Sequence, residues 1–160
     1  PAHPAAVVCR RSHPLAARPR PAPERFFSFP IVGPRLPPRV GRLLAGKATG
    51  ARIDESGNLV PPFHVESMRT TLDILQTSDA LAIVPLVLVA PELESGDLVA
   101  LDYRAPWLQT QYGFAWPRDA SLSAAARGLM AEVRDIEDAA VSRSATLARR
   151  WLRARSRAAR

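Results

Sequence analysis

The stretch VESMRTTLDILQTSDALAIVP, residues 65–85, decides the fold class of this chain. In its first half, Met68, Leu72 and Leu75 recur at helical spacing, so they predict one apolar helix face. Ser67 stands directly before them, in the position where a serine hydroxyl accepts a hydrogen bond from a free backbone N–H of the first turn. The first half therefore predicts a helix of about three turns that begins after Ser67.

The second half predicts a buried strand. Residues 80–84 are continuously apolar, a pattern typical of a strand that is covered on both faces in a parallel sheet. Pro85 follows where a second helix, residues 86–93, can begin, because proline fits the first turn of a helix. The order strand, helix, strand, helix predicts a doubly wound α/β fold.

Further elements are predicted on both sides of this stretch. Apolar runs bounded by Gly and Pro predict strands at 6–10, 26–32, 63–65, 97–103 and 111–116. A helix is expected at 39–45, and the polar, Gly-rich stretch 46–62 is expected to form a surface loop. Near the C-terminus we expect a helix that Ser121 caps, with one face formed by Leu122, Ala126, Leu129, Val133 and Ile136.

The net charge of +7 is unevenly distributed. Residues 1–42 carry eight arginines and one acidic residue, residues 43–137 carry an acidic excess, and residues 138–160 carry seven arginines and one aspartate. The basic character therefore belongs to two flanks rather than to one face of the central region. We expect the C-terminal flank to be a solvated, disordered extension or a helical continuation rather than a DNA-reading element.

Composition limits the cellular setting. No apolar run approaches the roughly 18 to 20 residues that a membrane span requires. The single cysteine, Cys9, has no partner for an internal disulfide, which favours a reducing, cytoplasmic location. The chain starts with Pro1 and without a recognisable leader, so we expect it to begin inside a longer protein.

Several segments, in order, resemble one known family. They are VVCRRSHPLA (7–16), FPIV (29–32), VESM (65–68), LQTSDALAIVP (75–85), GDLVAL (96–101) and YGF (112–114). Together they are similar to the effector-binding domain of LysR-type transcriptional regulators. Where many members have a glycine pair before the buried strand, this chain has Ser78 and Asp79.

The resemblance implies an α/β, type 2 periplasmic-binding-protein-like fold of two lobes. It implies a partial domain over residues 1–137, with the second lobe at about 26–103 and remnants of an incomplete first lobe at about 5–25 and 104–137. It also implies that the helix-turn-helix domain, which would read DNA, is missing. The segment 138–160 lies outside the resemblance.

Candidate binding residues follow from the predicted strand order. Ligand sites in open α/β sheets lie beyond the carboxyl ends of the strands. The residues at those positions are Pro34, Arg35, Glu66, Ser67, Met68 and Pro85. Ser67 is favoured because a helix start presents free N–H groups, which suit an anionic or hydroxylated ligand such as a carboxylate or a sugar. Arg35 could pair with a carboxylate.

The chain offers no pattern for catalysis, a metal or a cofactor. His13 lies in the segment that resembles the family, no serine or cysteine is spaced to form a nucleophile motif with it, and we expect a structural role. His3 and His64 are too isolated to predict a metal site.

The sequence thus predicts a non-enzymatic, ligand-sensing domain of a bacterial regulator. Its partners would be a small-molecule effector, DNA through the missing domain only, and a second copy in the full-length protein. A solute-binding protein of the same fold and a basic nucleic-acid-binding protein that acts through its flanks remain alternatives.

Overall fold

The structure, a computed structural model, describes residues 2–18 and 22–157. The strands are β1 (Ala2–Arg10), β2 (Val32–Gly33), β3 (Arg52–Ile53), β4 (Leu59–Val60), β5 (Phe63–His64), β6 (Ala82–Pro85), β7 (Leu98–Ala100) and β8 (Gln109–Gln111). The helices are α1 (Pro23–Phe26), α2 (Pro38–Leu44), α3 (Met68–Thr77), the 3-10 helix η1 (Leu86–Val89), α4 (Ala90–Ser95) and α5 (Ala124–Arg157). The α/β class and the helices after Pro37, Ser67 and Pro85 are as the sequence predicts.

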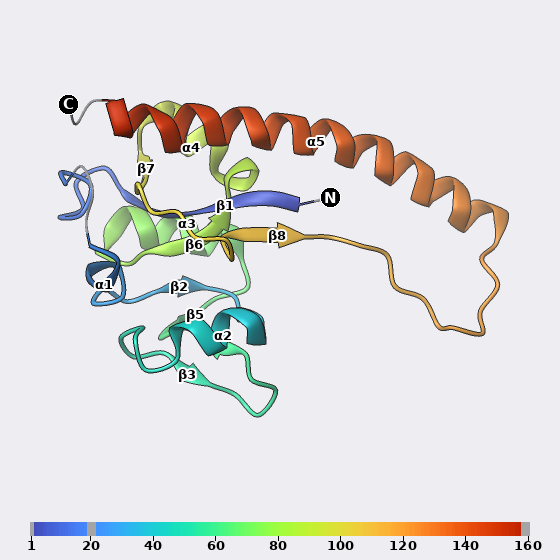
Figure 1. The fold of residues 1–160 in the computed structure, drawn as a ribbon, viewed down its shortest axis with the longest axis horizontal. Helices are drawn as coiled ribbons and strands as arrows, with labels where there is room; N and C mark the ends of the chain where they lie inside the picture. Colours follow the sequence, from blue (N-terminus) through green and yellow to red (C-terminus); the bar gives the residue numbers. More distant parts are fainter. Residues whose placement is uncertain (1, 19–21, 158–160) are drawn as a thin grey trace.

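Strand β1 is the centre of the main sheet (Figure 1). It pairs antiparallel with β6 on one side, where Ala5 lies opposite Pro85, and with β7 and β8 on the other. Leu81, the residue before β6, pairs in parallel with Ile31. Strand β2, which follows Ile31, pairs in parallel with β5. The run 80–84, expected to be a parallel strand, is parallel to its neighbour at Leu81 but antiparallel to β1 along β6, because a continuous apolar run indicates burial on both faces but not strand direction.

The two faces of β1 bury different clusters. Ala6 and Val8 point to a cluster that includes α3, η1, α4 and the end of α5, whereas Val7 and Cys9 point to a cluster with the residues of α1 and α2. The sequence assigns residues 5–10 to the first lobe. In the structure they join the same sheet as β6 and β7, which belong to the expected second lobe.

Two segments differ from their predicted form. The expected strand 26–32 begins as the short helix α1 and a turn, because Pro23 fits the first turn of a helix, and both Phe26 and Phe27 are buried. The expected loop 46–62 contains the β3–β4 hairpin, in which Leu59 and Val60 are buried.

Helix α5 departs most from expectation. Its cap is Ser123, whose Oγ accepts the N–H of Ala126 (3.1 Å), and not Ser121. The face expected to be buried is open, with Leu129 64% and Ile136 68% exposed, whereas Leu147, in the supposed tail, is 6% exposed. The tail is thus helical up to Arg157, which is one of the two forms expected for it. Residues 158–160 lie outside the described part.

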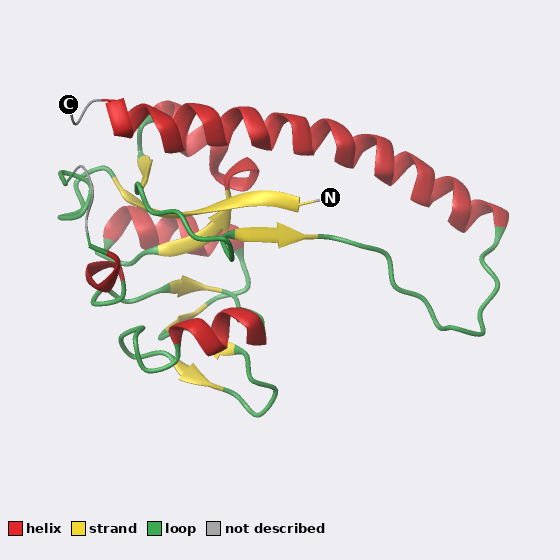
Figure 2. Cartoon of the chain, viewed as in Figure 1, coloured by secondary structure: helices red, strands yellow, loops and turns green. Residues whose placement is uncertain are grey.

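The beginning of α5 projects beyond the sheet together with the segment 112–123 (Figures 1 and 2). The end of α5 packs on the body through Leu147, Ala148, Trp151 and Leu152. The described structure contains no other element against Leu129 and Ile136, so their apolar surface faces solvent.

Candidate functional site

Three strand ends meet at one edge of the sheet, and the predicted site residues follow them. Strands β2, β5 and β6 run in the same direction, since Val32 pairs with Phe63 and Ile31 with Leu81 in parallel register. Their carboxyl ends therefore reach the same edge. We call this edge, with the residues that follow β2, β5 and β6, the Ser67 edge.

Ser67 caps helix α3 as predicted. Its Oγ accepts the N–H of Thr70 at 3.3 Å, and its backbone carbonyl accepts the N–H and the hydroxyl of Thr71, both at 3.0 Å. The side chain is exposed. The hydroxyl hydrogen and the free N–H groups of the first turn are donors, and the positive end of the helix dipole lies behind them.

Glu66 has a partner, His64, which the sequence did not predict to belong to a site. The Nε2 of His64 lies 2.8 Å from the Glu66 carboxylate, and both side chains are at least partly exposed. Glu66 follows His64 by two residues, just after β5 ends, so this short spacing was a usable signal. Any effector that contacts Glu66 also meets the imidazole of His64.

Arg35 turns toward the β3–β4 hairpin. Its Nη1 lies 3.8 Å from a carboxylate oxygen of Asp54, and more than half of the side chain is exposed. Asp54 also accepts hydrogen bonds from Asn58 and from the N–H of Ser56, which together lower the pKa of its carboxyl, with the Asn58 side chain as the largest cause. Arg35 thus has a weak partner, and its neighbour Pro34 is exposed.

Met68 and Pro85 contribute more to structure. Met68 is partly buried against the cluster beneath α3, and Pro85 precedes η1 while it pairs with Ala5 across the sheet. Of the six predicted residues, Pro34, Arg35, Glu66 and Ser67 present exposed groups at the Ser67 edge.

A second polar cluster lies at the end of β1 that is next to Pro85. The ring of His3 is buried, with Nε2 2.6 Å from Glu137 and Nδ1 3.0 Å from the hydroxyl of Ser144, both on α5. Ser144 is 0% exposed, so this serine, histidine and carboxylate offer no accessible nucleophile. The cluster joins residues more than 130 positions apart, and nothing in the sequence predicts that contact.

A cavity of about 620 Å³ adjoins this cluster between the segment after β8 and α5. Its lining is mainly aromatic and charged: Tyr112, Gly113, Phe114, Val133, Arg134, Glu137 and Asp138. The Arg134 guanidinium stacks over the Phe114 ring at 5.6 Å, so its charge already has a partner.

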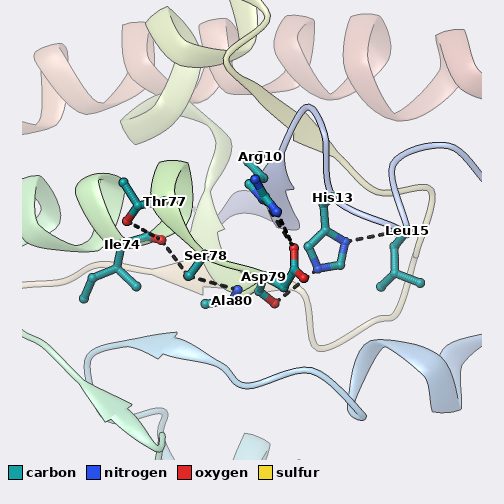
Figure 3. A network of polar contacts seen from close by, with 8 residues as sticks. All are labelled: Arg10, His13, Leu15, Ile74, Thr77, Ser78, Asp79 and Ala80. Carbon is teal, nitrogen blue, oxygen red and sulfur yellow. Dashed lines mark hydrogen bonds and ion pairs between the residues drawn. The ribbon is translucent and has the colours of Figure 1, made fainter.

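The opposite edge of the sheet is held by hydrogen bonds (Figure 3). Arg10, at the end of β1, donates from Nε and Nη2 to one Asp79 oxygen at 3.3 and 2.9 Å. The hydroxyl of Ser78 donates to the carbonyl of Ile74 (2.6 Å) and accepts the N–H of Ala80 (3.2 Å). Ser78 and Asp79, which depart from the family's glycine pair, thus fix the turn between α3 and β6. We call this the Asp79 edge.

His13 completes the Asp79 edge, and its predicted structural role fits its contacts. Its Nδ1 accepts the N–H of Leu15 (3.0 Å), so Nε2 carries the proton and donates to the Asp79 carbonyl (3.2 Å). Burial is the largest cause that lowers the pKa of His13 below its ordinary value of 6.5. A neutral ring suits the acceptor role of Nδ1.

Among the described residues, no group of three or more His, Cys, Asp and Glu is placed to hold a metal ion. Within the same residues, no helix is long and apolar enough to cross a membrane.

Comparison with known proteins identifies the family. The family model described as LysR substrate binding domain matches residues 2–138. This chain belongs to the LysR substrate-binding domain family, with its type 2 periplasmic-binding-protein-like α/β fold.

Two individual proteins are similar to the chain. The SDS degradation transcriptional activation protein of Pseudomonas sp. (strain ATCC 19151) is 31% identical over 143 residues, which cover 85% of this chain and 43% of that protein. The chain therefore spans less than half of that relative. The regulatory domain of MetR, a LysR family regulator from N. meningitidis, is 25% identical with a TM-score of 0.49, over 68% of this chain and 49% of that one.

Proposed function

We propose that this chain senses a small anionic or hydroxylated metabolite for a LysR-type transcription regulator in the cytoplasm, without catalysing a reaction. In this proposal the effector binds at the Ser67 edge, between this lobe and a facing lobe. Its different affinity for two arrangements of the lobes would change how a helix-turn-helix domain on the same protein binds DNA. The working protein would be a homo-oligomer.

The observation that carries the proposal is the start of α3. Ser67 is exposed, it lies where parallel strands end, and free backbone N–H groups follow it. Membership in the family supports a ligand-sensing role, and the relative named as a transcriptional activation protein supports a regulator over a solute-binding protein. Division of the chain into lobes remains part of the proposal.

Calorimetry with four probes tests the ligand site. Gluconate, succinate and benzoate represent hydroxylated, aliphatic and aromatic carboxylates, and hexyl sulfate represents the alkyl sulfates to which the name of the Pseudomonas protein refers. We expect saturable binding of at least one probe, and Ser67→Phe to weaken it at least about tenfold, since the ring fills the space before the helix. Ser121→Phe is the control, because Ser121 is an exposed serine outside this edge.

Unchanged affinity in a folded Ser67→Phe protein would contradict the site. The regulatory part is tested separately, by the gene sequence upstream of this segment. A helix-turn-helix there supports the regulator, whereas a secretion leader in its place would favour the solute-binding protein.

A further inference from the structure

A groove at the Asp79 edge, remote from the Ser67 edge, has the features of a second ligand site. One cavity of about 570 Å³ lies between the turn after β1, the end of α4 and the end of α5. A second cavity, of about 670 Å³, adjoins it and shares Arg11, Ser12 and Gly96 with it. We call the two adjoining cavities together the groove, with Arg11 and Ser12 between them.

Arg11 is the charged group of this groove that remains available. Its backbone N–H donates to the carbonyl of Asp97 (3.0 Å), which fixes the residue beside β7. Its guanidinium passes over Gly96, where a Cβ would lie 3.6 Å from Nη1. Among the residues that the structure describes, no carboxylate pairs with Arg11, whereas its neighbour Arg10 is paired with Asp79.

The acidic groups of the groove have partners of their own. The Glu94 carboxylate in the first cavity lies 3.7 Å from Arg150, which also stacks on Trp151 at 4.8 Å. Asp97, in the second cavity, accepts the hydroxyl of Ser95 at 2.7 Å. Arg11, which lines both cavities, is therefore the positive group beside which an anion is favoured, together with Ser12.

Seven of the twelve residues that line the first cavity are hydrophobic. They are Ala16, Ala17, Leu93, Leu98, Val99, Ala100 and Trp151, and His13 lines the same cavity. A ligand with an anionic head and a short apolar chain matches a cavity that has an arginine beside hydrophobic residues. A purely polar anion would leave the apolar part in water.

We propose that the groove binds a free amphiphilic monoanion, with its carboxylate on Arg11 and Ser12 and its apolar chain against Leu93 and Trp151. Such a ligand touches the turn after β1, α4 and the end of α5 at once. Its binding stabilises the packed end of α5 on the body. This site is independent of the Ser67 edge and of the effector proposed for it.

Octanoate is the probe, and the indole N–H signals of the three tryptophans in ¹H–¹⁵N NMR spectra are the readout. Trp151→Phe assigns the Trp151 signal. We expect octanoate to move this signal saturably, and butyrate and octanol to bind at least about tenfold more weakly, because butyrate lacks most of the apolar chain and octanol lacks the charge.

Arg11→Gln is expected to weaken octanoate about tenfold, because it removes a charge-assisted contact with the carboxylate. Arg42→Gln, at an exposed arginine of α2, and Ser67→Phe are expected to leave the affinity unchanged. Equal affinity for octanol and octanoate, an unchanged affinity in Arg11→Gln, or loss of the Trp151 response in Ser67→Phe would each overturn the proposal.

Discussion

Helix α3 has a serine at each end, and the two serines are used differently. At the Asp79 edge the hydroxyl of Ser78 makes two hydrogen bonds to backbone groups, and Arg10 and His13 hold the next residue. At the Ser67 edge the hydroxyl of Ser67 accepts one bond at 3.3 Å and stays exposed. At the C-terminal end of α3 the serine hydroxyl stabilises the fold. At the N-terminal end the serine hydroxyl and backbone N–H groups are available as donors to a ligand.

Two histidines give the largest expected contrast between the edges. His13 is 1% exposed, bonds to Leu15 and Asp79, and lies against the ring of Phe29 at 4.5 Å. We expect His13→Ala to lower the free energy of unfolding by about 2–4 kcal/mol, since it leaves a cavity and an unpaired N–H. His64→Ala, at the other edge, should cost less than about 0.5 kcal/mol, because the contact that it loses, with Glu66, is exposed. Urea unfolding followed by circular dichroism measures both, and equal losses would refute the contrast.

The two serines give a smaller contrast. Ser78→Ala removes a hydroxyl that satisfies two backbone groups, so we expect a loss of about 1–2 kcal/mol. Ser67→Ala should cost about 0.5 kcal/mol, at the low end for a helix cap, because the bond is long and exposed. The same unfolding experiment applies. A larger loss for Ser67→Ala than for Ser78→Ala would mean that Ser67 serves the fold first.

The smallest effect is a dependence of stability on pH that His13 contributes. Its pKa is lowered in the folded protein, so the unfolded chain takes up the proton first as the pH falls. The contribution is complete above pH 6.5 and is lost as the pH falls through 6.5 toward the folded pKa. Unfolding at pH 7.5 and 5.5 should therefore show a larger decline for the native protein than for His13→Gln. An equal decline in the two proteins would contradict a buried neutral imidazole.

The sequence predicted the local structure well where one local force dominates. The periodicity of Met68, Leu72 and Leu75 and the cap at Ser67 predicted α3, and Pro85 marked the start of η1. Family-like segments predicted the fold class, which the family match confirms. These signals act within a few residues or through whole motifs.

Features that depend on contacts between distant residues could not be predicted from the sequence. The face with Leu129 and Ile136 has the spacing of a buried face, yet periodicity does not say whether a partner is present to bury it. Conversely, Leu147 and Trp151 lie among arginines that suggested solvent, and packing against the sheet decides their place. The contact of His3 with Glu137 and Ser144 likewise depends on the tertiary structure alone.

The candidate site was predicted by position more than by contact. Strand ends pointed to Pro34, Arg35, Glu66, Ser67, Met68 and Pro85, but the partners of two of them, Asp54 for Arg35 and His64 for Glu66, follow from the strands and turns that the structure adds. The binding role of all six stays a prediction.

Backbone NMR shifts upon addition of a probe that binds in calorimetry test the central claim most directly, because they report on both ends of α3 in one experiment. The account predicts saturable shifts of the amide signals of Met68, Arg69 and Thr70, with the amide signals of Ser78, Asp79 and Ala80 unmoved at constant ionic strength and pH. It also predicts that Ser67→Phe abolishes the first set of shifts. Shifts of equal size at both ends, or shifts that persist in Ser67→Phe, would contradict a ligand site at the start of α3.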